Sequence, residues 1–142
     1  MKIKRRKKAP RELRELFGTN KLMLIEFDKE AKLYDFMAKF SGLGFLEISN
    51  LRNGYGLAWI GNGVILSTGF FQNIGGKKIL RYLSTKKFAR NYGLASTIVK
   101  VEDPDLIYST PKAKKFFNKL GYVKYRESKR EGVSTIIMRR KK

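Results

Sequence analysis

Residues 111–122 read Pro-Lys-Ala-Lys-Lys-Phe-Phe-Asn-Lys-Leu-Gly-Tyr, and they carry the clearest helical pattern in the chain. Four apolar residues recur there at i, i+3, i+4 and i+7: Ala113, Phe116, Phe117 and Leu120. Such spacing puts them on one face of a helix. Pro111 suits the first helical turn and Gly121 suits the residue after the last one. The segment therefore predicts an amphipathic helix whose Phe-bearing face packs on a core.

Strand-like runs lie on both sides of this helix. Residues 122–127 and 133–139 flank the polar loop 128–132, which is typical of a hairpin. Before the helix, residues 97–101 and 106–109 are both strand-like, and the proline between them excludes one continuous strand. The sequence leaves open which of these two runs is the fifth strand of the sheet.

The first half of the domain predicts a strand, a helix and a meander. Residues 22–27 form a short apolar run, and residues 28–41 continue with helical spacing after Asp28 as a cap. Three further runs predict antiparallel strands joined by turns rich in Gly and Asn: residues 45–49, 55–60 and 64–71. Residues 77–92 then place apolar positions at helical spacing among six basic ones. The order predicts an α/β (α+β) fold with a mixed, mostly antiparallel sheet of six to seven strands flanked by helices.

Positive charge dominates the composition. The 142 residues include 32 Lys and Arg against 12 Asp and Glu, a formal net charge of +20. We interpret residues 1–20 as a basic arm, residues 21–139 as one domain and residues 140–142 as a basic tail. Residues 2–14 and 139–142 suit sequence-independent contact with a polyanion, most simply DNA or RNA. The alternative is that the charge serves solubility alone.

Several chemistries are excluded by composition. The chain has no Cys and no His, so it has no disulfide, thiol nucleophile, Ser-His-Asp triad or zinc site built from thiolate or imidazole. Its apolar stretches are too short to span a membrane, so we expect no membrane association. The acidic turn around Pro104 is interpreted as a solvated loop, and we assign no metal to it.

The element order and residues 113–122 together resemble the GNAT superfamily of acyl-CoA-dependent N-acyltransferases. The segment is similar to the family's pattern of Ala, two residues, hydrophobic, Tyr, one residue, Lys, hydrophobic, Gly, aromatic. The resemblance covers residues 21–139 and implies acetyl-CoA or another acyl-CoA as cofactor. A small, basic chain of this kind resembles members expected from tailed bacteriophages, so we expect a cytoplasmic protein, or a virion component if it is phage-encoded.

The resemblance also implies a pyrophosphate-binding loop. The family's loop reads Arg or Gln, two residues, Gly, one residue, then Gly or Ala; residues 72–77 keep the Gln and the first Gly but end in Lys. We expect free amides at the start of the predicted helix 77–92 to hold the pyrophosphate. The residues expected to bind the cofactor are Phe70, Phe71, Gln72, Asn73, Ile74, Gly75, Gly76 and Lys77.

The catalytic position departs from the family. The family's Tyr, which protonates the leaving thiolate, aligns with Phe117, which has no proton to give. Tyr108 and Tyr122 lie nearby in the sequence as substitute acids, and we assign Tyr108 to the site. Glu47, expected on the first meander strand, is the candidate base for the amine. Positioning and polarisation by a strand amide also suffice for an amine of low pKa.

Two functional hypotheses follow. The first is an acyltransferase acting on an amine of an anionic or nucleic-acid-associated acceptor. The alternative is a GNAT-like fold without catalysis that acts as a basic nucleic-acid-binding or virion protein. They differ in whether the gap between the fourth and fifth strands is open, or filled by Phe70, Phe71 and Tyr108.

Overall fold

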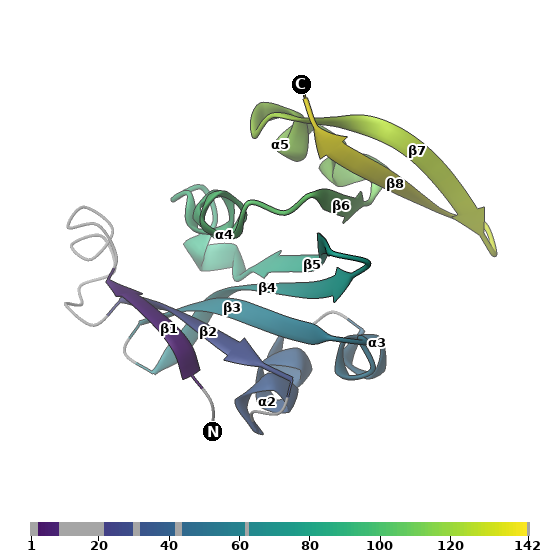
Figure 1. Ribbon diagram of the computed structural model, residues 1–142. Helices are drawn as coiled ribbons and strands as arrows, with labels where there is room; N and C mark the ends of the chain where they lie inside the picture. Colours follow the sequence, from purple (N-terminus) through teal and green to yellow (C-terminus); the bar gives the residue numbers. More distant parts are fainter. Residues whose placement is uncertain (1–2, 9–21, 30–31, 42–43, 62, 142) are drawn as a thin grey trace.

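An eight-stranded sheet organises the chain, in the order β1-β2-β3-β4-β5-β6-β8-β7 (Figure 1). The computed structural model describes residues 3–8, 22–29, 32–41, 44–61 and 63–141. The strands are β1 (Ile3–Lys8), β2 (Met23–Asp28), β3 (Gly54–Gly61), β4 (Val64–Ile74), β5 (Lys77–Thr85), β6 (Leu106–Ser109), β7 (Tyr122–Arg130) and β8 (Val133–Arg140). The helices are α2 (Lys32–Phe40), α3 (Phe45–Ser49), α4 (Leu94–Glu102) and α5 (Lys114–Lys119), with 3-10 turns η1 (Lys87–Ala89) and η2 (Pro111–Ala113).

The predicted architecture is confirmed. All described strand pairs are antiparallel except β5 with β6. The helix at residues 111–120 is present as η2 and α5, and the terminal hairpin follows it as β7 and β8. Of the two candidate fifth strands, residues 106–109 are the strand that pairs with β5. None of the helices that the structure describes is long and apolar enough to cross a membrane.

The sheet has more strands than predicted because part of the segment predicted as a basic arm, residues 3–8, forms strand β1. Ile3–Lys8 carries five basic residues and no apolar period, yet it pairs antiparallel with β2. An open sheet edge offers unpaired backbone groups to any extended segment, whatever its side chains. Residues 3–8 therefore belong to the sheet, while the rest of the predicted arm, residues 9–20, lies outside the described residues.

Two hydrophobic clusters pack on opposite faces of the sheet. Leu57 and Phe71 belong to the cluster that contains α4, whereas their neighbours Ala58 and Phe70 belong to the cluster under α2 and α3. Adjacent strand residues point to opposite faces, so α2 and α3 cover one face, and α4 covers the other (Figure 1). Gly69 lets α4 approach closely, since a Cβ there would lie 2.8 Å from Ile98 Cγ2.

The predicted helix over residues 77–92 is wrong. Residues 77–85 are strand β5, paired with β4 from Ile74↔Lys77 onward. Gly75 and Gly76, with φ of 58° and 75°, make the two-residue turn between them. A bulge explains the misleading period: Phe71 pairs with Leu80 and Phe70 with Tyr82, so one residue of β5 is extra. The bulge puts Leu80 and Leu83 on one face at helix-like spacing.

Two other predicted strands are helices. Residues 97–101 lie inside α4, where Leu94 and Ile98 are buried against the sheet at i and i+4. Their β-branched side chains favour a strand locally, but packing on the sheet decides the outcome. Residues 45–49 form the short helix α3, whose Ile48 is fully buried in the cluster with α2. The antiparallel meander therefore consists of β3, β4 and β5.

Candidate active site

A cleft opens where β5 and β6 separate. These parallel strands pair only at Ile79↔Leu106 and Leu80↔Ile107. Beyond them β5 stays with β4 as far as Thr85, whereas β6 stays with β8 as far as Ser109. The cleft has a volume of about 780 Å³ and is lined by β5, the segment after it, the start of α4, the end of β6, and α5 with the turn before it. The gap between the two strands is thus open.

The opposite end of this strand pair is clamped by Asp105. The Lys78 backbone N–H donates to Asp105 Oδ2 at 2.9 Å, and the Asp105 N–H donates to the Lys78 carbonyl at 2.8 Å. Arg140 Nη1 on β8 donates to Asp105 Oδ1 at 3.2 Å. The hydrogen bond from Lys78 holds the pKa of Asp105 below its usual range. Asp105 therefore fixes the closed end from which the two strands diverge.

The N-terminus of α4 forms one wall of the cleft. Gly93, with φ of 78°, precedes the helix, and the first helical hydrogen bond runs from the Thr97 N–H to the Gly93 carbonyl at 3.0 Å. The N–H groups of Leu94, Ala95 and Ser96 therefore have no acceptor within the helix, and all three residues line the cleft. Free amides and the positive end of the helix dipole suit a phosphate group.

The sequence at this wall matches the family's pyrophosphate pattern. Residues 90–95 read Arg-Asn-Tyr-Gly-Leu-Ala, so Arg90, Gly93 and Ala95 meet all three fixed positions. This match is missed from the sequence because the helix predicted over residues 77–92 places Gly93 just after a helix, whereas Gly93 directly precedes α4. The pattern of Arg90, Gly93 and Ala95 can be read from the sequence, but the wrong prediction of a helix over residues 77–92 includes Arg90 in that helix.

The pyrophosphate-binding loop predicted from the sequence, residues 72–77, does not lie at the cleft. None of residues 70–77 lines the cleft. Phe70 and Phe71 are buried in the two separate clusters, and Gln72 is 3% exposed, with its Nε2 donating to the Arg52 carbonyl at 3.2 Å. Asn73, Ile74, Gly75, Gly76 and Lys77 are the end of β4, the hairpin turn and the first residue of β5. No helix begins there, so the expected anion site at residues 73–77 lacks its structural basis.

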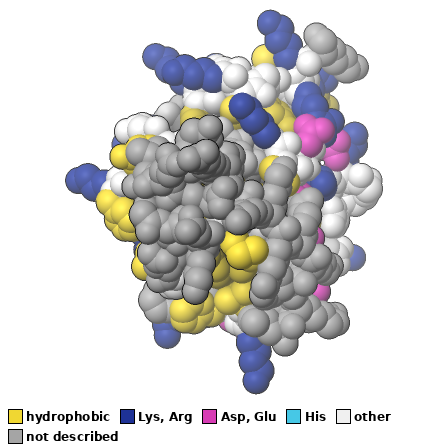
Figure 2. Space-filling model, turned by 90° about the vertical axis from the view of Figure 1, so that its left-hand side faces the viewer, with side chains coloured by type: hydrophobic (Ala, Val, Ile, Leu, Met, Phe, Trp, Pro, Cys, Tyr) yellow, Lys and Arg dark blue, Asp and Glu magenta, His cyan; other side chains and the backbone are white. Residues whose placement is uncertain are grey.

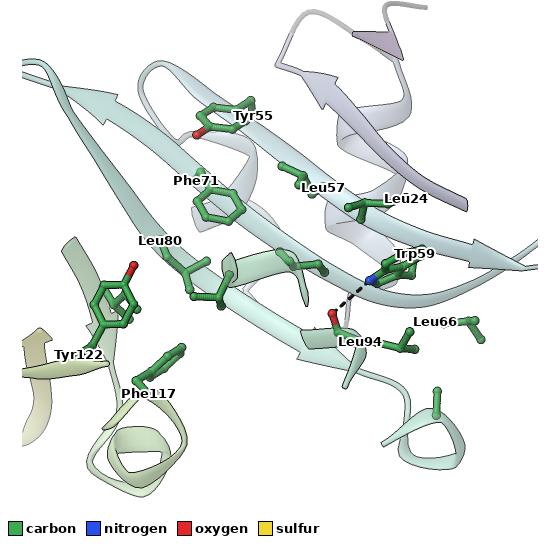
Figure 3. Close-up of a cluster of buried hydrophobic side chains, with 14 of the residues drawn as sticks. Leu24, Tyr55, Leu57, Trp59, Leu66, Phe71, Leu80, Leu94, Phe117 and Tyr122 are labelled. Atoms are coloured by element: carbon green, nitrogen blue, oxygen red, sulfur yellow. Dashed lines mark hydrogen bonds between the residues drawn. The ribbon is translucent and has the colours of Figure 1, made fainter. Parts of the chain in front are cut away.

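Trp59 connects the cleft wall to the core. Its ring is 1% exposed, and its Nε1 donates to the Leu94 carbonyl at 3.1 Å (Figure 3). Leu94 is the first residue of α4. A side chain of β3 therefore fixes the height of the helix N-terminus over the sheet.

Two aromatic residues of interest line the cleft. Phe117 reaches it from α5 and is 4% exposed, in an edge-to-face contact with Phe116 at 5.1 Å between ring centroids. Tyr108 reaches it from β6. Tyr122, the other tyrosine near the motif, is buried, and its hydroxyl donates to the Pro104 carbonyl at 2.7 Å. The structure thus brings Tyr108, but not Tyr122, to the cleft.

Glu47 stands on α3, not on a meander strand as predicted. Its Oε2 accepts a hydrogen bond from the Tyr82 hydroxyl at 2.8 Å, and Tyr82 is a lining residue of the cleft, whereas Glu47 is not. Burial and the hydrogen bond to Glu47 raise the pKa of the Tyr82 hydroxyl. Glu47 is therefore connected to the cleft through Tyr82.

The acidic turn binds arginine. Arg140 Nε donates to Asp103 Oδ1 at 2.9 Å, in addition to its bond with Asp105. Within the described ranges, no group of three or more Asp, Glu, His or Cys residues is placed to hold a metal ion.

Solved structures share this fold. Escherichia coli ElaA matches with a TM-score of 0.62 at 7% identity, covering 83% of this chain and 99% of that one. An acyl-CoA N-acyltransferase from Pseudomonas aeruginosa matches at 0.64 and 11%, covering 84% and 99%. A Bacillus anthracis acetyltransferase solved in complex with acetyl coenzyme A matches at 0.51 and 14%, covering 68% and 66%. No family model and no curated protein matches the sequence. The strand order, the splayed strand pair and these similarities show that the chain has the fold of the GNAT acetyltransferases.

Proposed function

We propose that the chain is an acyl-CoA-dependent N-acyltransferase that transfers an acyl group, most simply acetyl, to an amine. One observation carries the proposal: the open cleft between β5 and β6 ends at the free amides of α4, where Arg90, Gly93 and Ala95 fit the pyrophosphate pattern. An acyl-CoA supplies a thioester and a diphosphate. The cleft offers an extended strand edge to the chain between them and an anion site at one end.

The reaction needs one proton removed and one supplied. The amine attacks the thioester carbonyl carbon, a C–N bond forms, the C–S bond breaks and the thiolate leaves. The attacking nitrogen loses a proton, for which the Tyr82 hydroxyl and the Glu47 carboxylate offer a route away from the cleft. The thiolate gains a proton, for which Tyr108, a lining residue of the cleft, is the candidate that the sequence predicts. A backbone N–H of β5 beyond Leu80, where β6 has left the strand, can polarise the carbonyl.

Phe117→Tyr tests the departure from the family. The new hydroxyl lies at the cleft wall, so we expect thiol release that is equal to the wild-type rate or up to about tenfold faster. Phe88→Tyr, at a ring that is 64% exposed and outside the cleft, is the matched control. The measurement is kcat for acetyl-CoA with one amine acceptor. A kcat reduced more than tenfold at unchanged CoA affinity would contradict the expectation that a hydroxyl at residue 117 lies where it can protonate the leaving thiolate.

The proposal includes an acceptor that is anionic or associated with nucleic acid. The net charge of +20 supports it, and five consecutive basic residues lie on β1, at one edge of the sheet. Figure 2 shows further Lys and Arg side chains spread around one side of the molecule, with few Asp or Glu among them. Long-range attraction of this kind steers polyanions without reading their sequence.

Neutralising β1 is expected to weaken nucleic-acid binding without removing the strand. Deletion of residues 1–14 would remove a paired strand, so Lys4, Arg5 and Arg6 are changed to Gln, which preserves the backbone pairing. We expect weaker binding of single- and double-stranded DNA and RNA. The slope of log affinity against log salt should become shallower by up to about 2 units for single strands and up to about 3 units for duplex DNA. Lys100, Lys119 and Lys129, all exposed, changed to Gln give a control of equal charge. Equal losses in both triple variants would show that β1 is not the contact.

The decisive test of the function is thiol release from acetyl-CoA with amines, basic proteins and amine-bearing nucleic acids. Turnover that depends on an amine supports the acyltransferase. No thiol release with any acceptor, combined with tight, salt-dependent nucleic-acid binding, would favour the alternative of a binding protein without catalysis.

A further inference from the structure

A second hollow adjoins the acyl-CoA cleft and shares two of its lining residues, Arg81 and Tyr108. Its volume is about 570 Å³. The remaining lining residues come from the terminal hairpin: Arg126, Glu127, Ser128, Thr135 and Ile137. A molecule in this hollow would therefore sit next to one in the cleft.

Strand register places the hollow on the sheet face opposite α4. Arg126 pairs with Ile137 and Ser128 pairs with Thr135, so these four residues share one face of the hairpin. The alternate residues Ile136 and Met138 belong to the core cluster that contains α4. The hollow therefore opens on the face of α2 and α3, where Tyr82 meets Glu47.

Arg81 is held in a defined position at the junction. Its guanidinium lies over the Tyr108 ring, 4.7 Å from the centroid, and its Nη1 donates to Gln72 Oε1. Gln72 is buried, and its amide is itself fixed on the Arg52 carbonyl. Neutral contacts orient the guanidinium, and no carboxylate within the described ranges forms an ion pair with Arg81.

Arg126 gives the hollow a second cation. No described carboxylate forms an ion pair with it either. Glu127 also lines the hollow, but its carboxylate forms an ion pair with Lys124 at 3.5 Å. Its pairing with Ile136 gives it the strand register of the opposite face. The hollow thus combines two guanidinium groups with the hydroxyl-bearing Ser128 and Thr135. Guanidinium pairs of this kind recognise carboxylate and phosphate oxygens.

We propose that this hollow holds the acidic group of the acceptor, and that the preferred acceptor is a small amine that also carries a carboxylate or a phosphate. The inference rests on the proposed acyltransferase function. With the acidic group between Arg81 and Arg126, the amine reaches the open strand edge past Tyr108. The volume of the hollow suits a small molecule, and an amine on a nucleic acid becomes one outcome of the test.

Matched amines test the acceptor class by selectivity. The full chain is assayed with β-alanine against β-alaninamide and with phosphoethanolamine against ethanolamine, so that each pair differs in its acidic group. We expect kcat/KM to favour the acidic member at least about tenfold, and Arg126→Gln to reduce that ratio about tenfold or more. Lys129→Gln is the control: it removes one positive charge at a residue next to Ser128 on β7 that does not line the hollow. We expect this variant to keep the wild-type ratio. The two pairs distinguish a carboxylate from a phosphate.

A binding measurement separates this inference from the function on which it rests. CoA binding is followed by calorimetry, and the side-chain Nε–H signals of Arg81 and Arg126 are followed by NMR during titration with phosphoethanolamine and with β-alanine. A shift of the Arg81 signal that Arg126→Gln abolishes, and that ethanolamine does not produce, supports the anion site even if turnover fails. If CoA binds but the arginine signals do not shift, the anion site is overturned. Equal turnover of acidic and neutral amines by a protein that binds CoA overturns it too. Turnover only of amines on nucleic acid overturns it as well.

Discussion

Ala95→Asp is expected to lower the affinity for CoA by at least about 100-fold while the protein stays folded. Ala95 lies in the first turn of α4 and lines the cleft. An acidic residue in a first helical turn is favourable by about 0.3–1 kcal/mol, so the fold should not suffer. The same carboxylate about 4 Å from a bound diphosphate costs about 4 kcal/mol at an effective dielectric constant of 20. Binding and stability should thus change in opposite directions.

Lys100→Gln is the matched control for this variant. It changes the net charge by the same amount on the same helix, at an exposed position away from the cleft. Calorimetric titration with CoA and thermal unfolding are measured for both variants. Nearly wild-type CoA affinity in Ala95→Asp would show that the diphosphate does not lie at the start of α4.

Trp59→Ala is expected to destabilise the fold by about 3–5 kcal/mol, the largest stability effect that we predict. The ring is buried between the sheet and α4, and its removal leaves a large cavity (Figure 3). Trp59→Phe keeps most of the packing but loses the hydrogen bond to the Leu94 carbonyl. That smaller change should cost about 1–2 kcal/mol.

The pair of Trp59 variants also reports on the site. If the hydrogen bond sets the height of the helix N-terminus, Trp59→Phe should weaken CoA binding several-fold in a protein that remains folded at the assay temperature. Urea unfolding and CoA titration are measured together. A Trp59→Phe variant with reduced stability and unchanged CoA affinity would restrict Trp59 to a packing role.

The helix and hairpin at the C-terminal end could be predicted because local signals there agree with the tertiary structure. The Phe-bearing face at residues 113–120 is the buried face, and Phe117 reaches the cleft as the resemblance implied. Pro111 and Gly121 mark the ends of the helical segment, as their backbone preferences favour.

The central region could not be predicted from local pattern. The bulge in β5 imitates helical spacing, and the β-branched residues of α4 imitate a strand. Both are decided by packing between segments distant in sequence, such as Gly69 against Ile98. Because residues 77–92 are predicted as the helix and residues 97–101 as a strand, the anion site is expected before the wrong element, at residues 72–77. The structure has the helix start after residues 90–93 instead. β1 had no side-chain signal at all, since backbone pairing with β2 places it.

The most direct test of the proposed acyl-CoA cleft is a map of backbone amide signals in the wild-type chain on titration with CoA. We predict that the largest shifts fall on residues 90–96, at the start of α4, and on residues 81–85 of β5, while the hairpin turn at Gly75 and Gly76 is unaffected. Shifts centred on residues 72–77, or no shifts at millimolar CoA, would contradict the assignment of this cleft to an acyl-CoA.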